Sequence, residues 1–116
     1  MSVCFAKMRR RRGEPLSVRR EAGDSASDTG RVRSAGAVTS ALVEFSRPEE
    51  AAAELAGITG GADALIVESN SLAGLLSPDL LLYIDGGGAD RKNPELRESA
   101  DLLAEGELEA GDASLL

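Results

Sequence analysis

The chain of 116 residues has no histidine, no tryptophan and one cysteine, and these absences exclude several kinds of chemistry. Without histidine, Ser-His-Asp and Cys-His catalysis and histidine-ligated metals are ruled out. The lone Cys4 excludes an internal disulfide and cannot build a cysteine zinc site by itself. Aromatic residues are limited to Phe5, Phe45 and Tyr83. The core is therefore expected to be aliphatic and thin.

Long hydrophobic runs are also missing. No apolar run approaches the ~18 residues that a membrane span requires. The N-terminus has no uninterrupted apolar segment beside its arginines, so no secretory signal is predicted. A cytoplasmic protein of one domain, without membrane attachment, is the expectation.

Charge is distributed unevenly along the chain. Residues 1–33 carry nine Lys/Arg and four Asp/Glu, whereas residues 34–116 carry four and sixteen. The block "KMRRRRG" could contact nucleic acid through Arg9 to Arg12, because clustered arginines neutralise phosphates. No aromatic residue interleaves with the block, and the rest of the chain is acidic, so nucleic acid is not expected as the main partner. Residues 1–30 are predicted to be a basic, disordered leader.

The middle of the chain contains the clearest local signals. "AVTSALVEF", residues 37–45, is β-branched and partly alternating, which predicts a strand. The following "SRPEEAAAELAG" predicts a helix over residues 47–56. Ser46 and Glu49 fit a capping box, and Pro48 suits the first turn. Gly57 is expected to end this helix.

Two further apolar runs and a second helix complete the pattern. Residues 64–68, "ALIVE", and residues 80–85, "LLLYID", are typical of strands buried in a parallel sheet. Between them "LAGLL" predicts a short helical turn, capped by Ser69, Asn70 or Ser71. A helix is predicted from Pro94 through "PELRESADLLAEG", with Leu96, Ala100 and Leu103 on one face. Residues 31–105 thus form an α/β domain with a parallel sheet, followed by an acidic tail over 106–116.

Each of the two apolar strands ends in a carboxylate, Glu68 and Asp85. In open parallel sheets the strand ends face the ligand crevice, and a carboxylate there can hold Mg²⁺. The alternative is that an acidic residue simply marks the point at which the strand reaches solvent.

The segment after Asp85 has the layout of a phosphate site, a glycine-rich loop between a strand and a helix. Its weaker candidate phosphate ligands are Gly86, Gly87, Gly88, Arg91 and Lys92. The sequence matches neither G-x-x-x-x-G-K-[ST] nor G-x-G-x-x-G. A flexible connection is the competing interpretation.

With these pieces in view, "DALIVESNSLAGLLSPDLLLYID" resembles a segment of the P-loop NTPases of the molybdopterin-guanine dinucleotide biosynthesis protein B type. In that family an apolar strand ends in E-[GS]-N-S, and a turn leads to "PDL" and another strand. "SDTGRVRSAGA", residues 27–37, is similar to the family's Asp-Thr, helix and "AGA" stretch. "ADRKNPELRESADLLAEGE" resembles the section leading to its last elements. The likeness covers about residues 24–105.

The resemblance implies a fold, a ligand and a site. The fold would be part of a three-layer, P-loop NTPase-like α/β domain that lacks the first strand, the phosphate loop and its helix. The ligands would be GTP and Mg²⁺, and the partner a molybdenum-cofactor nucleotidyltransferase. Glu68 would face the magnesium ion. The other implied site residues are Ser69, Asn70, Asp28, Thr29 and, near the crevice, Asp85.

The phosphate loop supplies the phosphate cradle, a lysine and a Mg²⁺-binding hydroxyl in such enzymes. Without it, the isolated chain is not expected to hydrolyse GTP. One hypothesis is a truncated or degenerate GTP-binding accessory protein. A second is a non-enzymatic interaction module, an α/β remnant whose exposed sheet edge pairs with itself or with another protein. A nucleic-acid-associated protein is the third and weakest.

Overall fold

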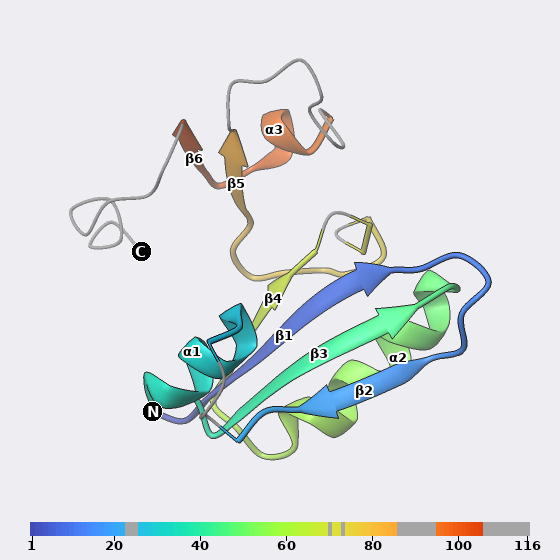
Figure 1. Cartoon of the computed structure of the whole chain (residues 1–116). Helices are drawn as coiled ribbons and strands as arrows, with labels where there is room; N and C mark the ends of the chain where they lie inside the picture. The colour runs from blue at the N-terminus through green and yellow to red at the C-terminus, as the bar shows by residue number, and fades with distance from the viewer. Residues whose placement is uncertain (23–25, 70, 73, 86–94, 106–116) are drawn as a thin grey trace. The chain divides into compact units, whose positions relative to one another are not determined.

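The computed structural model describes residues 1–22, 26–69, 71–72, 74–85 and 95–105 (Figure 1). The chain divides into two compact units, Met1–Leu76 and Ser77–Leu116. Each is an α/β arrangement and is described separately. Among the described residues, no helix is long and apolar enough to cross a membrane.

The first unit is built on a four-stranded sheet with the order β2-β3-β1-β4. Its strands are β1 (Val3–Arg10), β2 (Ser17–Arg20), β3 (Thr39–Phe45) and β4 (Ala64–Glu68). The central strand β1 pairs parallel with β3 and β4. The edge strand β2 pairs antiparallel with β3. The sheet is therefore mixed and mostly parallel, where the sequence predicted a parallel one.

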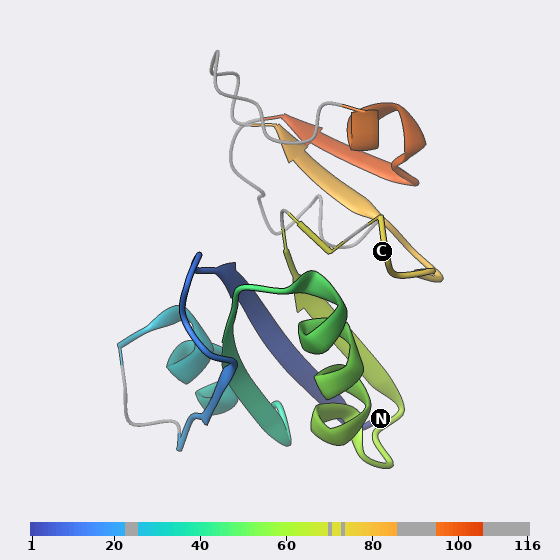
Figure 2. The ribbon, with the colours of Figure 1, turned by 90° about the vertical axis from the view of Figure 1, so that its right-hand side faces the viewer.

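Two helices lie on opposite faces of this sheet, α1 (Asp28–Ser34) and α2 (Pro48–Thr59) (Figure 2). The face under α2 carries the hydrophobic core. Its members, from β1, β3, α2 and the segment after β4, are Ala6, Met8, Ala41, Val43, Phe45, Ala51, Leu55, Ile58 and Leu72. We call this the α2 face. The opposite α1 face carries the intervening residues of each strand, among them Phe5 and Ser40, which are paired in the β1–β3 register.

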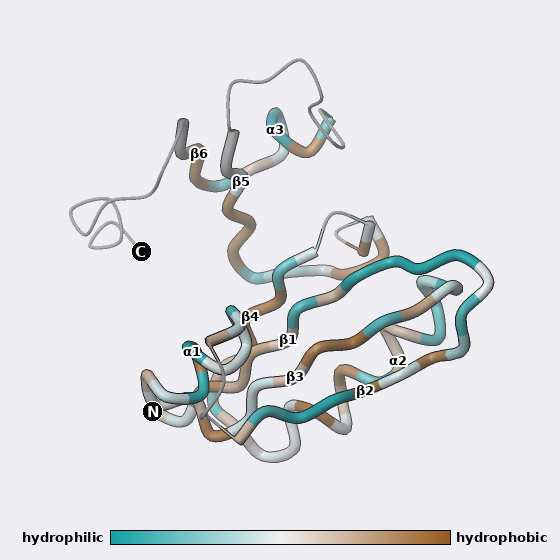
Figure 3. The backbone as a smooth tube through the Cα atoms, in the orientation of Figure 1, coloured by the Kyte–Doolittle hydropathy of each residue, from teal (hydrophilic) through white to brown (hydrophobic). Residues whose placement is uncertain are grey.

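The disordered leader predicted for residues 1–30 is wrong for β1, which is an inner strand of the sheet. The expectation of a domain without its first strand is wrong as well, because β1 lies between β3 and β4. Cys4, Phe5, Ala6 and Met8 are all buried. The apolar side chains of "VCFAKM" pack against both helices. Their burial favours an ordered strand, even though a run of charged arginines follows. Figure 3 shows the change, because the tube turns hydrophilic toward the end of β1. Helix α1 begins at Asp28, before the predicted start of the α/β domain at residue 31.

Helix α2 confirms the predicted helix but differs at both ends. Its N-cap is Arg47, without a side-chain cap hydrogen bond, so the capping box of Ser46 and Glu49 does not form. The Ser46 hydroxyl instead accepts a hydrogen bond from the Gly13 N–H at 3.4 Å. The helix passes through Gly57 and ends at Gly60, whose φ of +54° suits glycine.

The second unit contains a two-stranded parallel sheet of β5 (Leu82–Asp85) and β6 (Leu102–Glu105), with α3 (Glu95–Ser99) between them in sequence. The long helix predicted from Pro94 is wrong, because α3 ends at Ser99. The backbone of Asp101 donates to the Leu81 carbonyl at 2.8 Å, and its carboxylate accepts from the Leu81 N–H at 2.6 Å. These bonds and the pairing of β6 with β5 stabilise a strand at Leu103, although its spacing in the sequence favours a helix. The predicted acidic tail, 106–116, lies outside the described residues.

Candidate functional site

The carboxyl ends of the parallel strands β1, β3 and β4 meet at one edge of the sheet, where open α/β sheets bind ligands. Lys7 of β1 is paired in register with Glu68 of β4, and Arg9 of β1 with Glu44 of β3. Because paired residues of neighbouring strands point to the same face, all four side chains lie on the α1 face. Two cations and two carboxylates thus border this edge.

A direct ion pair joins Lys7 to the first residue of α1. The Lys7 ammonium donates a hydrogen bond to Oδ2 of Asp28 at 2.5 Å. Ser27 caps α1 by accepting a hydrogen bond from the Gly30 N–H at 3.1 Å, which fixes the start of the helix beside β1. The hydrogen bond from Lys7 and its positive charge lower the pKa of Asp28 below 3.8, so this carboxyl is ionised at neutral pH. The Lys7 ammonium is therefore paired with Asp28, while Glu68 lies opposite Lys7 in the β1–β4 register.

Glu68 is exposed at the end of β4. Among the ion pairs between described residues it takes part in none, so its carboxylate faces solvent beside Lys7. Ser69, its neighbour in the motif, has a local role. Its hydroxyl accepts hydrogen bonds from the N–H groups of Ser71 at 3.1 Å and Leu72 at 2.9 Å, which makes it the cap of the turn. Asn70 lies outside the described residues.

Thr29 is placed differently from its neighbour Asp28, although the sequence grouped the two. Thr29 is only 3% exposed, and its hydroxyl donates to Oε1 of Glu21 at 3.2 Å. Its carbonyl accepts a hydrogen bond from the buried Ser40 hydroxyl at 2.6 Å. These contacts fasten α1 to β3 and to the residue after β2. Thr29 is thus engaged within the fold, whereas Asp28 faces the edge.

Four arginines follow Lys7 at the end of β1 and in the connection to β2. The Arg11 guanidinium forms an ion pair with Glu44. Oε2 of Glu44 is buried and accepts no well-aligned hydrogen bond, so the charge of Arg11 compensates its burial. Arg9, Arg10 and Arg12 are exposed. In the described connection between β1 and β2, no helix follows these arginines. The edge therefore carries cations on side chains and not a loop of backbone N–H groups before a helix.

Sequence reasoning missed Lys7, which holds Asp28 and lies opposite Glu68. The sequence contains an indication of this role, because in "FAKM" Lys7 is the one polar residue between buried residues of a strand. Asp85 ends β5 in the second unit, and its side chain lies outside the described part of the structure, as do residues 86–94 with the glycine loop, Arg91 and Lys92. Asp28 thus contacts Lys7 directly, Glu68 lies opposite Lys7 in the strand register, and Asp85 belongs to another unit.

A magnesium ion would find few ligands ready at this edge. Within the described ranges no group of three or more Asp, Glu, Cys or His residues is arranged to hold a metal. Mg²⁺ commonly binds through one or two carboxylates together with water and substrate phosphates. Glu68 fits that mode, because it is an exposed carboxylate at a strand end. Asp28 already accepts a hydrogen bond from Lys7.

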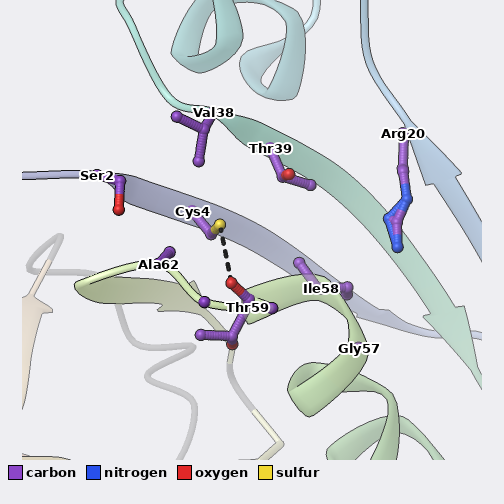
Figure 4. A pocket seen from close by; sticks show the side chains of 11 residues that line it. Ser2, Cys4, Arg20, Val38, Thr39, Gly57, Ile58, Thr59 and Ala62 are labelled. Atoms are coloured by element: carbon purple, nitrogen blue, oxygen red, sulfur yellow. Dashed lines mark hydrogen bonds between the residues drawn. The ribbon is translucent and has the colours of Figure 1, made fainter.

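A pocket of about 400 Å³ lies elsewhere, at the amino ends of β1 and β3 and the carboxyl end of α2 (Figure 4). It is shallow, and its lining includes Cys4, whose thiol donates to the Thr59 carbonyl at 3.6 Å, and one charged residue, Arg20. The C-terminus of a helix disfavours anions, and the lining holds no carboxylate. The polar edge around Lys7 is therefore the better candidate for a phosphate ligand.

Comparisons of this chain with family models, curated proteins and solved structures find no match.

Proposed function

We propose that the chain is a GTP-binding accessory protein of the kind involved in molybdenum-cofactor biosynthesis, a degenerate relative of the P-loop NTPases that it resembles. One observation carries the proposal. Lys7 is hydrogen-bonded to Asp28 and lies opposite Glu68 in the β1–β4 register. This arrangement supports the proposal, because one of the two carboxylates that the resemblance assigns to a nucleotide site contacts Lys7 and the other lies opposite it in the strand register.

The residues at this edge suit phosphate binding better than hydrolysis. The Lys7 ammonium can neutralise a phosphate oxygen, and Asp28 orients it. Bound Mg²⁺ would supply charge neutralisation between phosphates, and Glu68 is the carboxylate placed to hold it. The described residues contain no group of three metal-ligating side chains. The proposal is therefore binding without efficient turnover, and a nucleotidyltransferase of the cofactor pathway is the proposed partner.

Calorimetric titration of the full chain with GTP and GDP, with and without Mg²⁺, tests this role. Micromolar, Mg²⁺-dependent binding is expected. Glu68→Ala should abolish the Mg²⁺ dependence, and Lys7→Met should weaken binding at least about tenfold by removing one charge-assisted contact. Glu54→Ala is the matched control, because it removes an exposed carboxylate from α2.

Two results would refute the proposal. Binding weaker than about 1 mM, equivalent to roughly 4 kcal/mol, would remove any specific nucleotide role. Equal losses in Glu54→Ala and Glu68→Ala would show that only general charge matters.

A further inference from the structure

The outer edge of β4 is an unpaired strand edge in the first unit. Strand β4 is last in the sheet order, and in the part of the chain that the structure describes no strand pairs with its outer side. The opposite edge strand, β2, is exposed throughout and carries Arg19 and Arg20, the kind of charge that discourages edge pairing. β4 has the sequence "ALIVE", with no charge before its last residue. Only the β4 edge thus favours the addition of another strand.

The pairing of β4 with β1 determines which backbone groups face outward. The Ala64 N–H donates to the Ser2 carbonyl at 3.1 Å, and the register continues with Ile66 opposite Phe5. Alternate residues of a paired strand direct their N–H and C=O groups to opposite sides. Leu65 and Val67 therefore present their backbone groups to the outer edge. An added strand must bond to these two residues.

The side chains of β4 differ on the two faces. Leu65 and Val67 pack against the core on the α2 face. On the α1 face Ile66 is 54% exposed, the largest apolar side chain of the strand left to solvent. Glu68 follows on the same face and is exposed. A strand that pairs with β4 would cover Ile66 best if it placed an apolar residue directly opposite.

We propose that β4 pairs antiparallel with β4 of a second copy of this chain, about a twofold axis at Ile66. In this register Leu65 lies opposite Val67 of the second copy, and Val67 opposite its Leu65. Both are hydrogen-bonded pairs, because these residues carry the outward groups. Ile66 meets its own counterpart in the closer, non-hydrogen-bonded position. Glu68 lies opposite Ala64, so the two carboxylates stay apart.

Other registers fit the strand less well. A shift in one direction places Ile66 opposite Glu68. A shift of the second strand in the other direction would require the backbone groups of Asp63 to face the outer edge. The Asp63 N–H already donates to the carbonyl and hydroxyl oxygens of Ser2 at 3.1 and 3.0 Å. In a parallel, in-register pair of two outer edges, the outward N–H and C=O groups of Leu65 and Val67 would face groups of their own kind and could not bond. The strand is thus self-complementary in one arrangement.

This inference is independent of the proposed nucleotide role, because it depends on the edge of β4 and not on Lys7 or Asp28. The interface is short, below the ~1,200 Å² of stable complexes. The dimer should therefore be weak and reversible. Its formation would join two four-stranded sheets into one continuous sheet.

Cysteine cross-linking tests the register directly. The chain has a single cysteine, Cys4, which is 1% exposed, so the unaltered protein supplies a low background. Under mild oxidation Ile66→Cys should form a covalent dimer, because Cα atoms of a non-hydrogen-bonded pair lie at ~4.5 Å, within disulfide range. Glu68→Cys should not, since two copies of residue 68 would be roughly 14 Å apart. Failure of Ile66→Cys to cross-link, or equal cross-linking of both variants, would overturn the proposal.

Sedimentation equilibrium of the full chain measures the association itself. The unaltered protein should dimerise between about 0.01 and 1 mM, and Ile66→Lys should raise the dissociation constant at least about tenfold. Val38→Lys is the matched control, because Val38 is 53% exposed and lies outside the strands. Circular dichroism checks that both variants fold. A monomer up to about 1 mM, or equal effects of both substitutions, would contradict the self-pairing of β4.

Discussion

The Lys7 ammonium lies 2.5 Å from Oδ2 of Asp28, a residue 21 positions further along the chain. This hydrogen bond links the central strand to the start of α1 at the edge where the parallel strands end. It also makes the two residues interdependent. A change at either one should alter both the charge of the edge and its response to pH.

We expect Asp28→Asn to lower stability slightly at neutral pH and not at all in acid. The folded-state pKa of Asp28 lies below its ordinary value of 3.8, chiefly because Lys7 donates a hydrogen bond to it. The ion pair thus stabilises the fold above the ordinary pKa, and its contribution disappears as the pH falls through the lowered pKa. The effect is small because the carboxylate is 58% exposed and screened by solvent.

Urea unfolding of the unaltered protein and of Asp28→Asn between about pH 7 and pH 2 measures this difference. Lys7→Met and the double variant complete the cycle that isolates the pair. A difference that is constant across this range would contradict the assignment of the effect to Asp28.

The hydrogen bond between Ser40 and Thr29 should contribute more to stability than the exposed ion pair of Lys7 and Asp28 does. The Ser40 hydroxyl is 1% exposed and donates to the Thr29 carbonyl at 2.6 Å. Ser40→Ala removes the donor and leaves a buried carbonyl with one partner fewer, at a cost of about 1–2 kcal/mol. The free energy of unfolding in urea checks this value, and Ser40→Thr, which keeps the hydroxyl, should lose less. Equal losses in both variants would point to packing and not to the hydrogen bond.

Phe5→Ala should destabilise the first unit by about 3–5 kcal/mol, because it empties a buried site on the central strand. Phe5 is 7% exposed. Arg12→Ala, a few residues further along in an exposed position, should change the free energy of unfolding by less than about 0.5 kcal/mol. Thermal or urea unfolding followed by circular dichroism distinguishes the two. A mild effect of Phe5→Ala would mean that β1 is not central to the fold in solution.

The placement of β1 also affects any test of nucleic-acid binding by the arginine block. Deleting residues 1–12 would remove the central strand along with the arginines. Substitution of Arg10 and Arg12 by Gln is the suitable variant, because both side chains are exposed.

Two glycines near the end of α2 should respond to alanine in opposite ways. Gly60 has a φ of +54°, a conformation that L side chains rarely adopt, so Gly60→Ala should cost about 1–3 kcal/mol. Gly57 lies within the helix, and an added Cβ would meet nothing within 4 Å. Gly57→Ala should therefore stabilise the protein by about 0.5–1 kcal/mol. Melting temperatures of both variants give the comparison, and a shift of the same sign in both would refute the backbone explanation.

The sequence predicted the middle of the fold better than its ends. β3, α2, β4 and β5 all overlap predicted elements, because their periodicity and flanking prolines or glycines are strong. β1 was missed since the four arginines from Arg9 dominate the composition of residues 1–12, although "VCFAKM" is apolar enough for a buried strand. Composition averaged over a segment conceals a short strand whose partners lie more than thirty residues away.

The candidate site was predictable only in part. Glu68 and Asp28 were named from strand position and resemblance. Their common neighbour Lys7 depends on the β1–β4 register and on the position of α1, which local patterns do not contain. Thr29 was grouped with Asp28 because the two are adjacent in sequence. Neighbouring residues at the start of a helix point in different directions, and here Thr29 turns into the fold.

The central position of β1 has a consequence for synthesis. β1 leaves the ribosome well before its two neighbours, β3 and β4, which follow at residues 39–45 and 64–68. Until they emerge, an apolar segment with two open edges remains without its partners, a state prone to aggregation. The nascent chain should therefore depend on chaperones until Glu68 has left the ribosome, and slow decoding before that point should reduce the yield of folded protein.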